Sequence, residues 1–186
     1  MKKANLCFLI TMMFLLCGCS AYEIDRGYLV TTIGIEKSEN ETKIYIEAVS
    51  SSDAFGESLN KIVLTSGGES PEDAYKHLRH QLAKPIYFEQ LGAVVFNNGL
   101  FDDGIEFVEG LSNVSYGIYV VTTDNIEALF NYKPTDGVLG YEIIGLIKNN
   151  NDIKNRLYQI KQSNFYIPSV NCIDDKLVIS DNGELK

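Results

Sequence analysis

The sequence lacks several features that assign a chain to a class of function at once. It has no tryptophan, and only two histidines and four prolines occur in its 186 residues. Lysine and arginine number 16 against 25 aspartates and glutamates, which gives a net charge of -9 and no basic surface for phosphates. This acid excess argues against nucleic acid as a partner. With 45% hydrophobic and 22% charged residues, the composition is that of a globular chain, neither disordered nor fibrous.

The chain also lacks a hydrophobic run long enough to cross a bilayer, which takes about 20 residues. Its most apolar stretch extends only from Leu6 to Leu16, behind Lys2 and Lys3. A positive start followed by a short apolar run is typical of a secretory signal peptide. We therefore predict that residues 1–18 are a signal peptide rather than a transmembrane anchor.

The segment Leu16 to Cys19 resembles a bacterial lipobox, in which an aliphatic residue, a small residue and glycine precede the cysteine that receives diacylglycerol. Cys19 is accordingly the predicted lipidation site and the N-terminus of the mature chain. Cleavage before it would remove Cys7 and Cys17 and leave Cys172 without a thiol to pair with, so we expect no disulfide. Cleavage would also make the chain more acidic. Because an acidic chain is repelled by anionic lipid, the acyl chains must supply the attachment.

Hydrophobic patterning predicts an α/β (α+β) fold with a mixed β-sheet, in which an N-terminal hairpin precedes alternating strands and helices. The predicted strands are 29–35, 44–49, 61–65, 91–96, 115–123, 166–173 and 176–180. The predicted helices are 71–83, 101–111, 124–130, 141–148 and 152–162, with a loop over 132–140. The run from Leu91 to Phe96 is continuously apolar, which predicts a central strand buried on both faces. The last two strands have no evident partner in the preceding part of the chain.

The predicted helix over 71–83 starts with Ser70 as N-cap and Pro71 in the first helical position. Asp73, His77 and His80 lie on one face of it, opposite its apolar stripe. Two histidines and one carboxylate are a possible metal site. The competing interpretation is a solvated helix face. No H-E-x-x-H motif or second ligand-bearing helix is present, which favours the solvated face and no metal.

The motifs that carry enzymatic chemistry are missing. The glycine turn from Ser66 to Ser70 lacks the lysine of a phosphate-binding loop, and no G-x-S-x-G nucleophile elbow occurs. No cysteine–histidine pair is expected once the signal peptide is removed. We therefore predict no catalytic residue, no cofactor and no enzymatic activity.

A series of short motifs follows Cys19. They are Glu23-Ile24, Ile33 to Lys37, Gly68 to Ser70, Leu82 to Phe88, Asp103 to Phe107, Ile126 to Leu129 and Ile167 to Val170. In order and spacing they resemble the C-subunit lipoproteins of bacterial spore germinant receptors, the Ger(x)C family.

The resemblance implies a non-enzymatic subunit that takes part in spore germination and is anchored through Cys19 on the outer face of the inner spore or cell membrane. It also implies assembly with two integral membrane subunits that sense nutrients. Members of the family are about twice as long and have three domains, so we expect a short or truncated member. Residues 19–164 would be the N-terminal domain and 165–186 the start of an incomplete second domain. The alternative is a surface lipoprotein that binds a solute or a metal ion.

Overall fold

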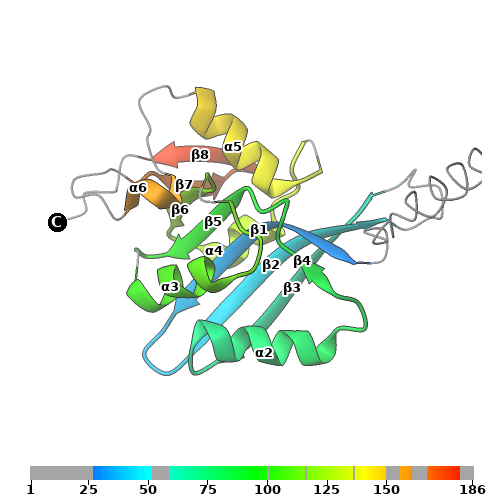
Figure 1. Cartoon of the computed structure of the whole chain (residues 1–186). Helices are drawn as coiled ribbons and strands as arrows, with labels where there is room; N and C mark the ends of the chain where they lie inside the picture. Colours follow the sequence, from blue (N-terminus) through cyan, green and yellow to red (C-terminus); the bar gives the residue numbers. More distant parts are fainter. Residues whose placement is uncertain are drawn as a thin grey trace, which may run out of the picture.

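The computed structural model describes residues 27–51, 59–99, 101–115, 117–135, 137–149, 156–160 and 167–180. The predicted signal peptide and Cys19 lie outside these ranges. Within them, eight strands form one mixed sheet and five helices pack on it, which confirms the predicted fold class (Figure 1). No helix in the described ranges is long and apolar enough to cross a membrane.

Three antiparallel strands form one side of the sheet, as the predicted hairpin and third strand required. They are β1 (Tyr28–Lys37), β2 (Thr42–Ser51) and β3 (Leu59–Gly68). β2 lies between the other two, and β3 is the edge. The turn between β1 and β2 is closed by the backbone N–H of Ser38, which donates to the carbonyl oxygen of Glu41 at 2.9 Å.

The other side of the sheet is mostly parallel, as the alternation of strands and helices predicted. Its strands are β5 (Ala93–Asn97), β6 (Tyr119–Thr123), β7 (Ser169–Ile173) and β8 (Lys176–Ser180). β5 runs parallel to both β1 and β6, and its first four residues are buried. The prediction of a central strand buried on both faces is therefore confirmed. A short strand that was not predicted, β4 (Ile86–Tyr87), pairs in parallel with the start of β1.

Helices cover both faces of the sheet, so the core has two halves. α2 (Pro71–Gln81), α3 (Asp102–Gly110) and α6 (Leu157–Ile160) pack on one face. α4 (Ile126–Asn131) and α5 (Leu139–Asn149) pack on the other. Figure 1 shows α2 and α3 on the side opposite α5. α5 begins at Leu139, inside the segment 132–140 that was predicted to be a loop. A contact with Glu47 of β2 defines this start.

The expectation that the last two strands have no partner in the preceding part of the chain is wrong. β7 pairs with β6, and the backbone N–H of Thr122 donates to the carbonyl of Pro168 at 3.0 Å. The side-chain oxygen of Asn171 accepts hydrogen bonds from the hydroxyl of Thr123 at 2.9 Å and from the backbone N–H of Asp124 at 3.0 Å. These long-range bonds attach β7 and β8 to the sheet. The domain boundary at residue 164 stays a prediction.

Candidate functional site

The N-terminus of α2 is capped as predicted. The Ser70 hydroxyl accepts a hydrogen bond from the backbone N–H of Asp73 at 3.2 Å, and Pro71 occupies the first turn. The Asp73 carboxylate in turn accepts from the backbone N–H of Glu69 at 3.2 Å. Both bonds satisfy N–H groups at or next to the helix start, where helical partners are missing. Asp73 therefore stabilises the start of the helix.

The three candidate metal ligands lie on α2, where both histidine side chains are exposed. Nδ1 of His77 lies 2.9 Å from the carbonyl oxygen of Gly67, which occupies one ring nitrogen, and its Nε2 lies 3.7 Å from Oδ1 of Asp73. His80 is exposed on the same helix. In the part of the chain that the structure describes, no group of three or more histidine, cysteine or acidic side chains could hold a metal ion.

A buried carboxylate on β2, which the sequence reasoning missed, organises the other face of the sheet. The side chain of Glu47 is 0% exposed. Its Oε2 accepts from the hydroxyl of Thr31 at 2.6 Å and from that of Thr32 at 3.1 Å. The backbone N–H of Leu139 donates to its Oε1 at 2.9 Å, and that of Gly140 lies 3.3 Å from Oε2. The carboxylate is therefore satisfied by donors from a strand and from a helix.

A β-bulge in β1 brings both hydroxyls to Glu47. Thr31 is an extra residue in the pairing with β2, between the pair Val30–Ala48 and the pair Thr32–Glu47. Side chains of consecutive strand residues normally point to opposite faces of the sheet. The bulge changes their direction, so that two consecutive threonines reach the same carboxylate.

The same carboxylate lies at the N-terminus of α5. The free N–H groups and the helix dipole favour a negative charge at this end. A glycine is required at the contact, because a Cβ on Gly140 would lie 2.6 Å from the carbonyl oxygen of Thr31. Glu47 and Gly140 together fix where α5 starts and how near to the sheet it packs.

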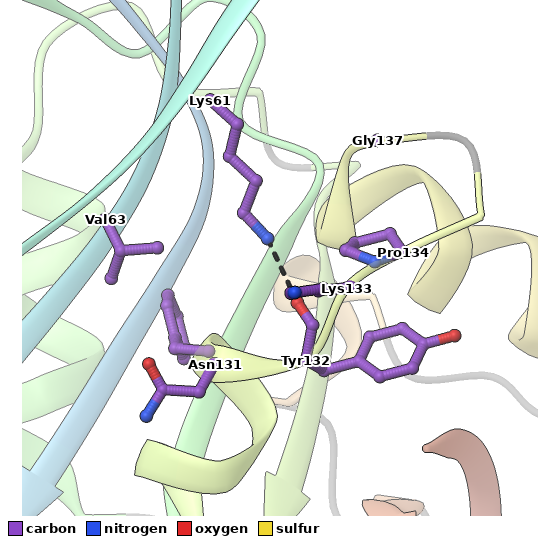
Figure 2. Close-up of a pocket in the computed structure, with 8 residues that line it drawn as sticks. Lys61, Val63, Asn131, Tyr132, Lys133, Pro134 and Gly137 are labelled. Carbon is purple, nitrogen blue, oxygen red and sulfur yellow. Dashed lines mark hydrogen bonds between the residues drawn. The ribbon is translucent and has the colours of Figure 1, made fainter.

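Lys61 of β3 connects this buried group to the surface. Its Nζ lies 3.1 Å from Oε1 of Glu47 and donates to the carbonyl oxygen of Tyr132 at 3.2 Å, and its side chain is 25% exposed. Figure 2 shows this side chain reaching from its strand to the backbone of Tyr132, with Pro134 to the right of the contact. The phenol of Tyr132 donates to Oε1 of Glu142 at 2.7 Å, which raises the pKa of that phenol. Lys61 and Glu142 thus attach the segment that joins α4 to α5.

These contacts border a surface pocket of about 380 Å³. Its lining is Lys61, Val63, Phe130, Asn131, Tyr132, Lys133, Pro134 and Gly137. The ammonium group in it is already balanced by Glu47. The lining offers apolar contact and hydrogen bonds, but it holds no nucleophile next to a general base, which covalent catalysis requires.

Two further titratable side chains are shifted toward their neutral forms. The hydroxyl of Tyr45 donates to Oε2 of Glu36 at 2.9 Å, and burial together with this carboxylate raises the pKa of Tyr45 far above its ordinary value. Cys172 packs against the apolar cluster on the face of the sheet that α4 and α5 cover, and burial raises the pKa of its thiol as well. Because the thiolate is the reactive form of cysteine, the raised pKa lowers the reactivity of Cys172.

The family model for the spore germination protein N-terminal domain matches residues 20–169. The chain belongs to this family. Membership confirms the resemblance to germinant receptor C subunits and gives the protein a role in spore germination. The matched segment begins directly after Cys19 and includes Glu47, its donors and the strands from β1 to the start of β7. No curated protein and no solved structure matches the chain.

Proposed function

We propose that the protein is a lipid-anchored, non-enzymatic subunit of a nutrient germinant receptor. In this proposal Cys19 carries the lipid on the outer face of the inner spore or cell membrane, and the domain acts by assembling with two integral membrane subunits. The supporting observation is that the family match starts at residue 20, directly behind the lipobox cysteine. The matched family domain therefore begins directly after the predicted lipidation site.

The chemistry of the domain supports binding rather than catalysis as its function. Both faces of the sheet are covered by apolar core, and the described buried carboxylate is fully hydrogen-bonded. A net charge of -9 gives the chain no electrostatic attraction to anionic lipid, so acyl chains have to hold it. Each buried CH₂ contributes about 0.8 kcal/mol, and two chains suffice for stable anchoring.

Replacing the predicted lipidation site tests the proposal. We expect Cys19→Ala to shift the protein from the membrane fraction of spores to the soluble fraction by a factor of about 10 or more, since both acyl chains are lost. Cys172→Ala is the matched control, because Cys172 belongs to β7 and not to the lipobox. This substitution should leave the protein in the membrane fraction. A Cys19→Ala protein that remains fully membrane-bound would show that the anchor is not at this residue.

Assembly is tested with the wild-type protein in the same membranes. After gentle detergent extraction we expect the two integral membrane subunits to co-purify with it. A protein that is lipidated but purifies without any membrane subunit would contradict the receptor role.

A further inference from the structure

A second pocket lies where the described part of the chain begins. It has a volume of about 590 Å³. Its apolar floor is formed by Leu29, Ile86, Tyr87 and Phe88, and its polar rim by Glu89, Gln90, Ser112 and Asn113. An apolar hollow with a polar rim is the form of an interface pocket that receives one large side chain of a partner.

The floor of this pocket is held in place before any partner arrives. Phe88 is buried, and its ring centroid lies 5.8 Å from that of Tyr75 on α2. The backbone N–H of Leu91 donates to the carbonyl oxygen of Phe88 at 3.0 Å. Binding to a preformed floor loses little conformational entropy, which favours affinity.

The pocket is also next to the predicted anchor. Gly27, the first described residue, packs so tightly against the ring of Tyr87 that no Cβ fits between them. The following backbone N–H, that of Tyr28, donates to the carbonyl oxygen of Pro85 at 2.9 Å. Seven residues, 20–26, separate Cys19 from Gly27, so eight residue steps join them, and eight fully extended residues span at most about 28 Å. If Cys19 is lipidated, the pocket lies within the reach of the extramembrane segments of a membrane protein.

We propose that this pocket is the docking site for an extramembrane peptide of an integral membrane receptor subunit, which inserts one aromatic or aliphatic side chain. The proposal rests on the proposed function, because it uses the anchor at Cys19. A bilayer surface offers no protruding side chain to fill a concave hollow. The carboxylate of Glu89, which accepts from the amide of Asn113 at 3.1 Å, repels anionic headgroups and favours a basic residue beside the inserted side chain.

The first experiment fills the mouth of the pocket. Ser112 is exposed on the rim, so Ser112→Trp should place an indole over the floor without disturbing the core. We expect the amount of integral membrane subunits that co-purify with the full chain to fall about 10-fold or more. Asn40→Trp is the matched control, since it adds the same side chain with the same charge in the exposed turn at the other end of β1 (Figure 1). Equal recovery of the subunits with both variants would overturn the docking site.

The outcomes separate this inference from the proposed function. Undiminished co-purification with Ser112→Trp refutes the pocket while the receptor role stands. Loss of co-purification with the wild-type chain contradicts the receptor role and, with it, the docking site. A Ser112→Trp protein that leaves the membrane fraction would mean that folding or processing failed, so the second experiment keeps Ser112 and changes a different residue of the rim.

The second experiment identifies what touches the rim. A photoreactive benzoylphenylalanine replaces the exposed Gln90, with the same residue at Asn40 as control. Irradiation of spore membranes should give an adduct between position 90 and an integral membrane receptor subunit, and no such adduct at position 40. Adducts only with phospholipid, or only with residues 20–26 of the same chain, would overturn the proposal, and so would the absence of any adduct at position 90.

Discussion

The two longest helices in the described part of the chain, α2 and α5, have 11 residues each and lie on opposite faces of the sheet, but their starts are specified in different ways. α2 begins at Ser70 and Pro71, which lie next to each other in the sequence and cap the helix locally. α5 begins where Glu47 accepts from Leu139, a residue 92 positions further along the chain. One helix start is therefore encoded by neighbouring residues, whereas the other depends on the finished sheet.

Both helices bury apolar side chains, but their polar ends differ. α2 buries Ala74 and Leu78, and α5 buries Leu139, Ile143 and Ile147. A local cap can be lost at the cost of one hydrogen bond. The start of α5 instead shares one carboxylate with a strand bulge and a lysine, so its loss should affect the whole domain.

The largest effect is expected from Glu47→Ala. It removes the acceptor for two threonine hydroxyls and for the first turn of α5, and it leaves Lys61 without its ionic partner. Breaking a buried ionic pair costs about 3–5 kcal/mol. We expect a decrease of this size in the free energy of unfolding, measured by urea denaturation of the chain without residues 1–19. Glu47→Gln keeps the volume and one acceptor oxygen, so it should lose less. A Glu47→Ala protein within about 1 kcal/mol of wild type would contradict the role given to this residue.

The next effect in size concerns the close approach of α5 to the sheet. In Gly140→Ala the new Cβ would meet the carbonyl oxygen of Thr31, a backbone atom that cannot move aside alone. Overpacking of this kind costs about 1–3 kcal/mol. Gly145→Ala is the matched control on the same helix, because a Cβ there meets nothing within 4 Å. It should stabilise the domain by about 0.5–1 kcal/mol, because alanine favours the helix. Thermal unfolding of both variants measures the difference, and equal shifts would refute the contact.

The smallest effect is expected at the start of α2. Ser70→Ala removes the side-chain acceptor for the backbone N–H of Asp73, which typically costs about 1 kcal/mol. Ser112→Ala, on an exposed turn, serves as control and should change stability by less than about 0.5 kcal/mol. If Ser70→Ala were as damaging as Glu47→Ala, the distinction between the two helix starts would not hold. Urea denaturation measures all of these variants on one scale.

The features that could be predicted from the sequence are those with local causes. The cap at Ser70 and the apolar run from Leu91 to Phe96 identified α2 and β5, because neighbouring residues determine both. The start of α5 and the attachment of β7 through Asn171 were missed, since their partners lie far away in the chain. One signal for Glu47 was present in the sequence: it is the only charged residue in the otherwise apolar strand from Ile44 to Val49. A charge in such a strand indicates a buried polar contact.

The distance in sequence between Glu47 and α5 bears on the order of folding during synthesis. The N-terminal part of a chain is synthesised first, and β1, β2 and β3 can pair as soon as they emerge from the ribosome. Their carboxylate has no helix donors until Leu139 and Gly140 follow. We therefore expect the three-stranded unit to stay only transiently formed until the docking of α5 completes it. The buried carboxylate would thus delay the stable folding of β1, β2 and β3 until most of the domain has been synthesised.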